Sequence, residues 1–132
     1  MEKIIMVIEK SKDFYDAYSE NCEGIYAAGG SIDEVKKDTE AAIGMIKRDY
    51  PESEWPAPLR GEYEIEWKMD VQSFLEYYKD YLSLSGLEKI TGINQKQLSN
   101  YLNRRSKPRR RQMERISEGL HRFASELLSV TL

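Results

Sequence analysis

The sequence predicts an α+β protein of two domains. A small antiparallel sheet with one helix, in β-β-β-α-β order, is expected over residues 1–69, and an all-helical domain over residues 70–132. Strand-like patterns are confined to the first half of the 132 residues, whereas the second half repeats apolar residues at spacings of three and four. A chain of this length is sufficient for two small domains.

Three strands are expected before the helix of the first domain. Residues 4–8 form a continuous apolar run, which is typical of a buried central strand. Residues 14–19 alternate after a polar turn, which predicts a hairpin. Residues 25–28, bounded by glycines on both sides, predict a short third strand.

The one helix of this domain is predicted to begin after Ser31, because Ser-Ile-Asp-Glu has the spacing of a capping box. Apolar residues at helical spacing continue to about Asp49, and Pro51 ends the helix. Three prolines in residues 51–61 predict an irregular connection. Residues 62–67 then alternate strictly, which predicts a last strand with one buried face. An antiparallel sheet covered by one helix follows from this order.

Four helices are expected in the second domain, with the second and third in helix-turn-helix order. The first covers residues 71–82. The second is short and ends near Thr91, and Ser85 with Glu88 has the capping-box spacing that would begin it. The fourth runs from Arg109 to the C-terminus with an apolar stripe: Met113, Ile116, Leu120, Phe123 and Leu127.

The third of these helices carries the most informative surface of the chain. Gly92 predicts a tight turn, Asn94 is a good N-cap, and Gln97 is placed as its capping-box partner. One face of the helix is apolar, with Leu98, Tyr101 and Leu102. The other face presents amides, a lysine and a hydroxyl: Gln95, Lys96, Ser99, Asn100 and Asn103. Because such side chains read base edges in the major groove, we interpret this segment as a recognition helix.

Charge is divided unevenly along the chain. Residues 1–70 hold 9 Lys and Arg against 17 Asp and Glu, a net charge of −8, whereas residues 71–132 hold 11 against 6, a net charge of +5. Residues 96–115 alone carry eight cations and one acid. Ordinary solvated surface charge accounts for the acidic half, but it accounts poorly for eight cations in twenty residues, which favour contact with phosphate.

Residues 87–108 resemble the Cro/repressor class of helix-turn-helix domains, with a scaffold helix, a Gly turn, a polar-faced recognition helix and a Lys-Pro pair. The resemblance implies that the recognition helix reads bases, through Gln95, Lys96, Ser99 and Asn100. It also implies that the scaffold helix start and the following loop hold the DNA backbone, through Ser85, Asn103, Arg104, Arg105 and Lys107. Arg104 stands where many relatives have glycine, which puts the turn geometry in doubt. The alternative is a helical module without DNA-binding activity.

Arg109, Arg110 and Arg111 extend this basic segment into the next helix. They could be exposed arginines with no role, but three cations at a helix N-terminus oppose the helix dipole. We therefore expect them to contact DNA phosphates.

The first half resembles the HicB antitoxin family over about residues 1–68. The matching features are an aromatic second strand, a Gly-aliphatic-aromatic step and a Gly before a capped helix: Tyr18, Gly24, Ile25, Tyr26, Gly30, Ser31 and Glu34. The resemblance implies a partial RNase H-like fold that does no chemistry. It implies binding of a small basic, mRNA-cleaving HicA-like toxin and repression of the chain's own operon. The motif is chiefly structural, so it assigns no toxin-contacting residues.

Two other functions remain open alongside the antitoxin. The chain could be a transcription regulator without a toxin, whose first domain dimerises or senses a ligand; a neighbouring gene for a small basic protein would separate the two. A homodimer or higher homo-oligomer is expected on operator DNA, because one helix-turn-helix reads a half-site. The pairing surface would lie near the end of the last helix, at Phe123, Leu127, Leu128 and Val130. The alternative is that these residues close the helical core.

Enzymatic activity, cofactors and metals are not expected. A metal-dependent nuclease needs a carboxylate within the central strand, and the predicted strand 4–8 has none. The lone His121 and the lone Cys22 have no catalytic partners in the sequence. The strand aromatics Phe14, Tyr15, Tyr18 and Tyr26 could stack on RNA, but aromatics at strand spacing are more typical of core. Without an apolar run long enough for a membrane span or a leader signal, a cytoplasmic protein is expected.

Overall fold

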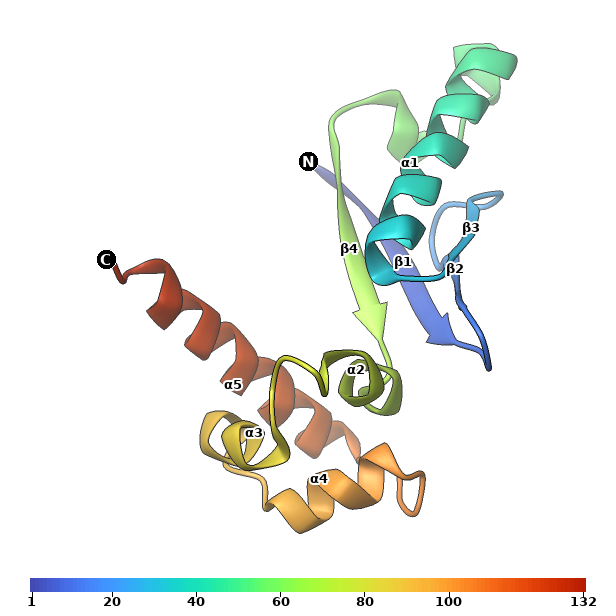
Figure 1. Cartoon of the computed structure of the whole chain (residues 1–132). Coiled ribbons are helices and arrows are strands. Elements are labelled where there is room, and N and C mark those ends of the chain that lie inside the picture. The colour runs from blue at the N-terminus through green and yellow to red at the C-terminus, as the bar shows by residue number, and fades with distance from the viewer. The chain divides into compact units, whose positions relative to one another are not determined.

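The computed structural model describes residues 1–132, which divide into two compact units, Met1–Asp70 (unit 1) and Val71–Leu132 (unit 2). Unit 1 contains four strands and one α-helix, and unit 2 contains four α-helices (Figure 1). The predicted α+β class and the β-β-β-α-β order are thereby confirmed. None of the helices combines the length and the apolar character that crossing a membrane requires.

The sheet of unit 1 is mixed. Its strands are β1 (Glu2–Lys10), β2 (Tyr15–Ser19), β3 (Tyr26–Gly29) and β4 (Tyr63–Met69), in the order β3-β2-β1-β4. β1 is central, as predicted, and pairs antiparallel with β2 but parallel with β4. The expectation of a wholly antiparallel sheet is therefore wrong for β4. The reason is that a helix, not a hairpin, joins β3 to β4, and a helical crossover returns the chain in the same direction.

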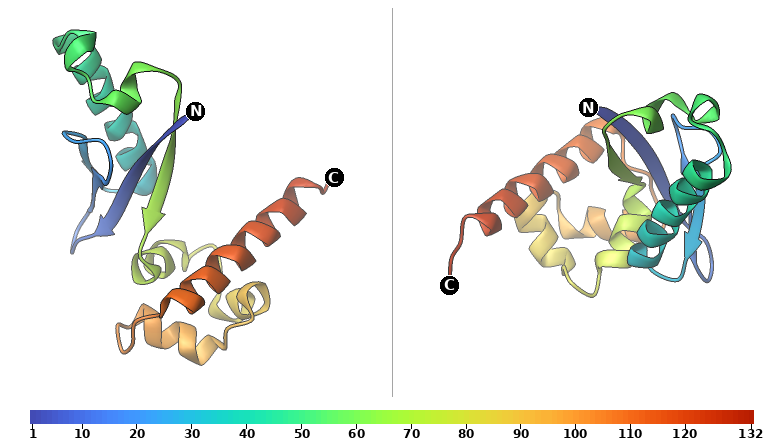
Figure 2. Two further views of the ribbon diagram at one scale, coloured as in Figure 1. Left: turned by 180° about the vertical axis from the view of Figure 1, so that it is seen from behind. Right: turned by 90° about the horizontal axis from the view of Figure 1, so that it is seen from above.

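The helix α1 (Ile32–Asp49) lies along one face of this sheet (Figures 1 and 2). The predicted cap is present, because Ser31 Oγ accepts a hydrogen bond from the Glu34 backbone N–H at 3.2 Å. The Glu34 carboxylate in turn accepts one from the Gly30 N–H at 2.6 Å. Alternate residues of β1 face the helix and are at most 1% exposed: Ile4, Met6 and Ile8. Val35, Thr39 and Ile43 complete this core from α1.

The strand aromatics do not all belong to the core. Tyr15 is buried, but Phe14, Tyr18 and Tyr26 are 45%, 40% and 70% exposed. The expectation that these four are core is thus wrong for three of them. Because side chains alternate along a strand, Tyr15 and Ala17 face the α1 side of β2 while Asp16 and Tyr18 face the other side.

The proline-rich connection contains two short 3₁₀ helices, η1 (Glu52–Glu54) and η2 (Ala57–Arg60), where irregular chain was predicted. Each begins directly after a proline, whose fixed φ suits the entry to a helical turn. Leu59 from η2 is 1% exposed and anchors the connection in the core.

Unit 2 is built from α2 (Val71–Tyr78), α3 (Leu84–Thr91), α4 (Gln95–Leu102) and α5 (Arg110–Leu128). Its buried core combines residues of all four helices with the turn residue Ile93: Val71, Leu75, Leu87, Ile93, Leu98, Tyr101 and Ile116. The first helix was predicted to reach Leu82 but ends at Tyr78. Leu82 still packs against the core, from the turn that leads to α3.

The N-cap of α3 is Ser83 and not Ser85. Ser83 Oγ accepts a hydrogen bond from the Gly86 N–H at 3.0 Å, while Ser85 lies inside the helix with its hydroxyl 3.2 Å from that of Ser83. Starting the helix at Leu84 lets that side chain pack against the core. The predicted capping box of Ser85 and Glu88 is therefore wrong.

α5 has two unlike halves. In the first, Ile116 and Leu120 pack in the core, and Gly119 is buried so close to α3 that a Cβ there would lie 2.5 Å from the Ile90 carbonyl oxygen. The last turns extend past the other helices of unit 2 (Figures 1 and 2). There Leu127, Leu128 and Val130 are 55%, 88% and 57% exposed, and Phe123 is half-buried. The alternative that these residues close the helical core is therefore wrong for the three that are exposed.

Candidate nucleic-acid interface

The turn between α3 and α4 has the geometry that the sequence predicted. Gly92 ends α3 with φ of +74°, in the left-handed region that favours glycine, and its N–H donates to the Glu88 carbonyl. Ile93 is buried, and its N–H donates to Thr91 Oγ1 at 3.1 Å. Asn94 then caps α4, because its Oδ1 accepts from the Lys96 N–H at 2.7 Å. Two short helices are thus held at a tight turn, as a helix-turn-helix requires.

Glu88 fixes α4 and not its own helix. Its carboxylate accepts a hydrogen bond from the Gln95 N–H at 2.8 Å, so it satisfies one of the first free amides of α4. The predicted capping-box partner, Gln97, instead donates its Nε2 to Ser106 Oγ at 3.3 Å. A negative charge at the N-terminus of α4 also suits the helix dipole. Glu88 therefore couples α3 to α4.

α4 presents its polar residues outward, as predicted. Leu98 and Tyr101 are 1% and 3% exposed, which orients the helix on the core. Of the predicted base-reading residues, Gln95 and Lys96 are exposed, and Ser99 and Asn100 are half-buried. With Leu98 and Tyr101 packed inward, the period of the helix places these four on the opposite side. The outward face of α4 is thus a row of hydrogen-bonding side chains.

Asn103 and Arg104 make contacts within the protein. The Asn103 amide donates to the carbonyl and hydroxyl oxygens of Ser99, at 3.0 and 3.2 Å. Arg104 has φ of +60°, in the left-handed region that favours glycine. Its guanidinium donates to Gln72 Oε1 at 3.1 Å, and Gln72 Nε2 donates to the Leu102 carbonyl at 3.2 Å. The turn is therefore formed without glycine, with Gln72 of α2 holding it.

The remaining predicted backbone-contacting residues surround the C-terminal end of α4. The N–H groups of Arg105 and Ser106 both donate to the Asn100 carbonyl, which folds the loop back against the helix. Five cations of this loop and the start of α5 are exposed and take part in no ion pair: Arg105, Lys107, Arg109, Arg110 and Arg111. Arg109 occupies the N-cap of α5 without a side-chain cap, and no acidic residue lies in the first turn. Ser85 is exposed at the start of α3.

Three residues that position this surface were not singled out from the sequence for that role: Gln72, Glu88 and Arg115. Arg115 of α5 donates from Nη2 to the Gly92 carbonyl at 3.0 Å, so it ties α5 to the turn before α4. Each of the three acts on a partner between 7 and 32 positions away in the chain. Local sequence patterns carry no signal for contacts of this kind.

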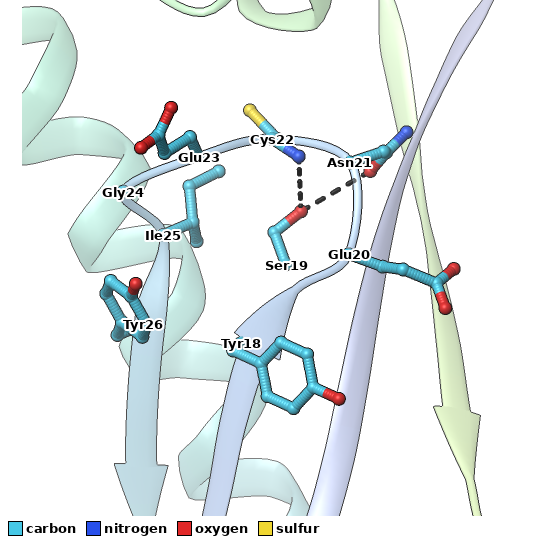
Figure 3. Close-up of a pocket in the computed structure, with 9 residues that line it drawn as sticks. All are labelled: Tyr18, Ser19, Glu20, Asn21, Cys22, Glu23, Gly24, Ile25 and Tyr26. Carbon is cyan, nitrogen blue, oxygen red and sulfur yellow. Dashed lines mark hydrogen bonds between the residues drawn. The ribbon is translucent and has the colours of Figure 1, made fainter.

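The carboxylates and Cys22 are the candidate metal ligands of unit 1. No group of three or more His, Cys, Asp or Glu side chains is placed to hold a metal ion. Cys22 is buried in the loop between β2 and β3, and burial raises the pKa of its thiol, which disfavours the reactive thiolate. The hollow in this loop, about 370 Å³, is lined by residues 18–26 (Figure 3).

Comparisons of the chain with models of protein families, with curated proteins and with solved structures give no match. What these surfaces bind is therefore inferred from their own residues alone.

Proposed function

We propose that the chain is a HicB-type antitoxin, which masks a small basic, mRNA-cleaving toxin through unit 1 and represses its own operon through unit 2. The observation that carries the DNA-binding half is the outward face of α4 together with the exposed, unpaired cations beside it. An outward row of two exposed side chains, Gln95 and Lys96, and two half-buried ones, Ser99 and Asn100, beside five such cations fits a duplex better than any other ligand.

Reading of DNA follows from the chemistry of α4. The outward face of α4 enters the major groove, where the Lys96 ammonium suits guanine and the Asn100 amide, one turn farther along the helix, suits adenine. Arg105, Lys107 and the arginines that begin α5 lie beside the groove and hold phosphates, which set affinity and register without reading sequence. The hydrogen bonds of Glu88 and Arg115 hold α4 in place relative to α3.

Three features support the antitoxin half of the proposal. The order of elements agrees with the family that the sequence resembles, and the net charge of −8 over residues 1–70 suits a basic partner. The carboxylates at the ends of β1, Glu2 and Glu9, are separated by the buried apolar residues of the strand. The central strand β1 therefore lacks the mid-strand carboxylate of a metal-dependent nuclease, and we propose that unit 1 binds without doing chemistry.

A homodimer is part of the proposal, because a single helix-turn-helix reads only a half-site. The stripe along α5 continues at spacings of three and four beyond the core, through Phe123 and Leu127, and the exposed Val130 follows just past the end of the helix at Leu128. A stripe of this spacing on an otherwise polar helix suits pairing with a second copy about a two-fold axis. Leu127→Asp should therefore shift the full chain from dimer to monomer in light scattering, whereas Ser125→Asp on the polar side should not.

We propose that a small basic protein is encoded beside this chain's gene, and co-expression with that neighbour tests the proposal. Expression of the neighbour alone should arrest growth, and the full chain should restore growth and co-purify with it. The full chain should also bind the DNA upstream of its own gene. If the neighbour is harmless or no complex forms while DNA binding persists, the chain is a transcription regulator without a toxin.

A further inference from the structure

The face of the sheet opposite α1 carries side chains that the core does not use. α1 is the only α-helix of unit 1 and packs against the face that holds Ile4, Met6 and Ile8. On the other face, Ile5 and Val7 of β1 are half-buried, and Tyr18 and Tyr26 are exposed. We call these four residues the open-face strip.

The open-face strip is continuous across three strands. The register pairs Val7 with Tyr18 and Tyr18 with Tyr26, so the three side chains form one row. Figure 3 shows the two tyrosine side chains on adjacent strands, beside the loop that joins β2 to β3. Asn21 of that loop bonds the Ile5 N–H and the Lys3 carbonyl, at 2.9 and 2.7 Å, which fixes the loop on β1. Neighbouring tyrosines on a rigid sheet are typical of a protein-binding surface.

Carboxylates surround this strip in excess. Glu9 and Asp16 lie directly opposite each other in the β1–β2 register and on the same face as Val7 and Tyr18. Opposed like charges destabilise a strand pair, so the arrangement costs free energy in the unbound protein. Glu66 of β4 lies on this face as well, opposite Ile5.

The lysines of this face do not neutralise those three carboxylates. Lys3 Nζ lies 4.0 Å from the Glu64 carboxylate, and Lys68 Nζ lies 3.1 Å from that of Glu20. Glu9, Asp16 and Glu66 take part in no ion pair and are exposed. A phosphate backbone would be repelled here, which excludes nucleic acid as the natural occupant. A partner with cationic side chains would instead relieve the repulsion.

We infer that the open-face strip, with its rim of Glu9, Asp16 and Glu66, is the docking surface for a protein that presents Lys or Arg side chains around an apolar centre. The inference rests on the proposed antitoxin function and names the surface that meets the toxin. The tyrosine rings accept both apolar contact and the stacking of a guanidinium, and the carboxylates bind the same cations. Masking of a basic, RNA-binding surface by charge-matched contact follows from this chemistry.

The test measures the affinity of the full chain for the purified small basic protein encoded beside its gene, by titration calorimetry. Two variants alter the surface. One combines Tyr18→Ala with Tyr26→Ala, and the other carries Glu9→Lys alone. Two controls make matched changes on α1, at the 54% exposed Met45 and at the exposed Glu40: Met45→Ala and Glu40→Lys. Glu9→Lys and Glu40→Lys change the net charge of the chain equally. A loss of affinity in Glu9→Lys alone would therefore come from direct contact with the partner and not from long-range electrostatic attraction.

Each surface variant should bind at least about tenfold more weakly, as expected for central interface residues, while the controls bind like the wild type. Wild-type affinity in the surface variants, or equal losses in the controls, would overturn the inference and leave the antitoxin function standing. If the unaltered chain does not bind the neighbour at all, the proposed function fails first. Loss of self-association in the tyrosine variant would overturn the inference too, because the occupant would be a second copy.

Discussion

The two units of this chain expose opposite chemistries. Unit 1 carries a net charge of −8 and presents tyrosines and carboxylates on a rigid sheet, whereas unit 2 carries +5 and presents amides and cations around one short helix. In the sheet of unit 1 and in α4 of unit 2, one face packs in an apolar core, and the residues proposed to bind a partner lie on the opposite face. This difference supports the proposal that each unit selects its partner by charge, one a basic protein and the other a polyanion.

The surfaces also differ in how they are held. The open face of unit 1 lies on paired strands, so backbone hydrogen bonds fix its side chains. α4 is only eight residues long, too short to be stable alone, and its position depends on Glu88, Gln72 and Arg115. Substitutions outside the proposed DNA-binding surface should therefore impair the binding activity of unit 2 readily. Substitutions outside the proposed toxin-binding surface should impair unit 1 less.

The largest effect is expected for Lys96→Ala combined with Asn100→Ala. Loss of two base contacts, at about 1–3 kcal/mol each, should lower specific operator affinity by about thirtyfold or more. Toxin neutralisation should be unchanged. Fluorescence anisotropy with an operator fragment and a scrambled duplex measures this, with Lys37→Ala on α1 as control. Equal weakening on both duplexes would mean that these residues do not read sequence.

Gly119→Ala should destabilise unit 2, because its Cβ would lie 2.5 Å from the Ile90 carbonyl oxygen and 3.0 Å from Thr91 Cα. Overpacking of this kind costs about 1–3 kcal/mol. The matched change Gly44→Ala in α1 meets nothing within 4 Å and should stabilise unit 1 by about 1 kcal/mol. Urea unfolding of both variants measures the two shifts. A Gly119→Ala protein as stable as the wild type would contradict the close α3–α5 packing.

Replacing Arg109, Arg110 and Arg111 by Ala should weaken binding to every DNA sequence alike. Each lost phosphate contact should also reduce the slope of log K against log salt by about 0.9. Titrations at three or more salt concentrations measure the slope, with Arg122→Ala, farther along α5, as control. An unchanged slope would show that these arginines never meet phosphate.

The smallest effect is expected for Glu88→Ala. Loss of the carboxylate that caps the Gln95 N–H should cost about 1 kcal/mol of stability and weaken operator binding modestly. Glu88→Gln keeps an acceptor oxygen and should restore part of the loss. Glu118 is an exposed acid on α5, and Glu118→Ala is the control. An equal effect in that variant would show that Glu88 acts only through its negative charge and not through the hydrogen bond to Gln95.

Sequence patterns predicted what depends on near neighbours in the chain. The caps at Ser31 and Asn94, the Gly92 turn and the outward face of α4 follow from residues within a few positions of one another. The two-unit division followed from composition and periodicity. The left-handed turn at Arg104 was less certain from the sequence, and there the guanidinium bonds to Gln72 in another helix.

Features that depend on distant pairing could not be predicted in this way. The parallel pairing of β4 with β1 is set by the crossover through α1, and alternation within residues 62–67 is the same for either direction. The exposure of Tyr18 and Tyr26 depends on which face α1 covers, which the period of the strand alone does not specify. Ser83 replaced Ser85 as a cap because packing of Leu84 set the start of α3.

If the two surfaces act separately, each can be disabled without the other, and two full-length variants should show this. The first combines Tyr18→Ala with Tyr26→Ala, and the second combines Lys96→Ala with Asn100→Ala. Both are assayed for rescue of growth from the neighbouring small protein and for operator binding. We expect the first variant to lose rescue and keep operator binding, and the second to do the reverse. Loss of both activities in either folded variant would show that the surfaces are not separate.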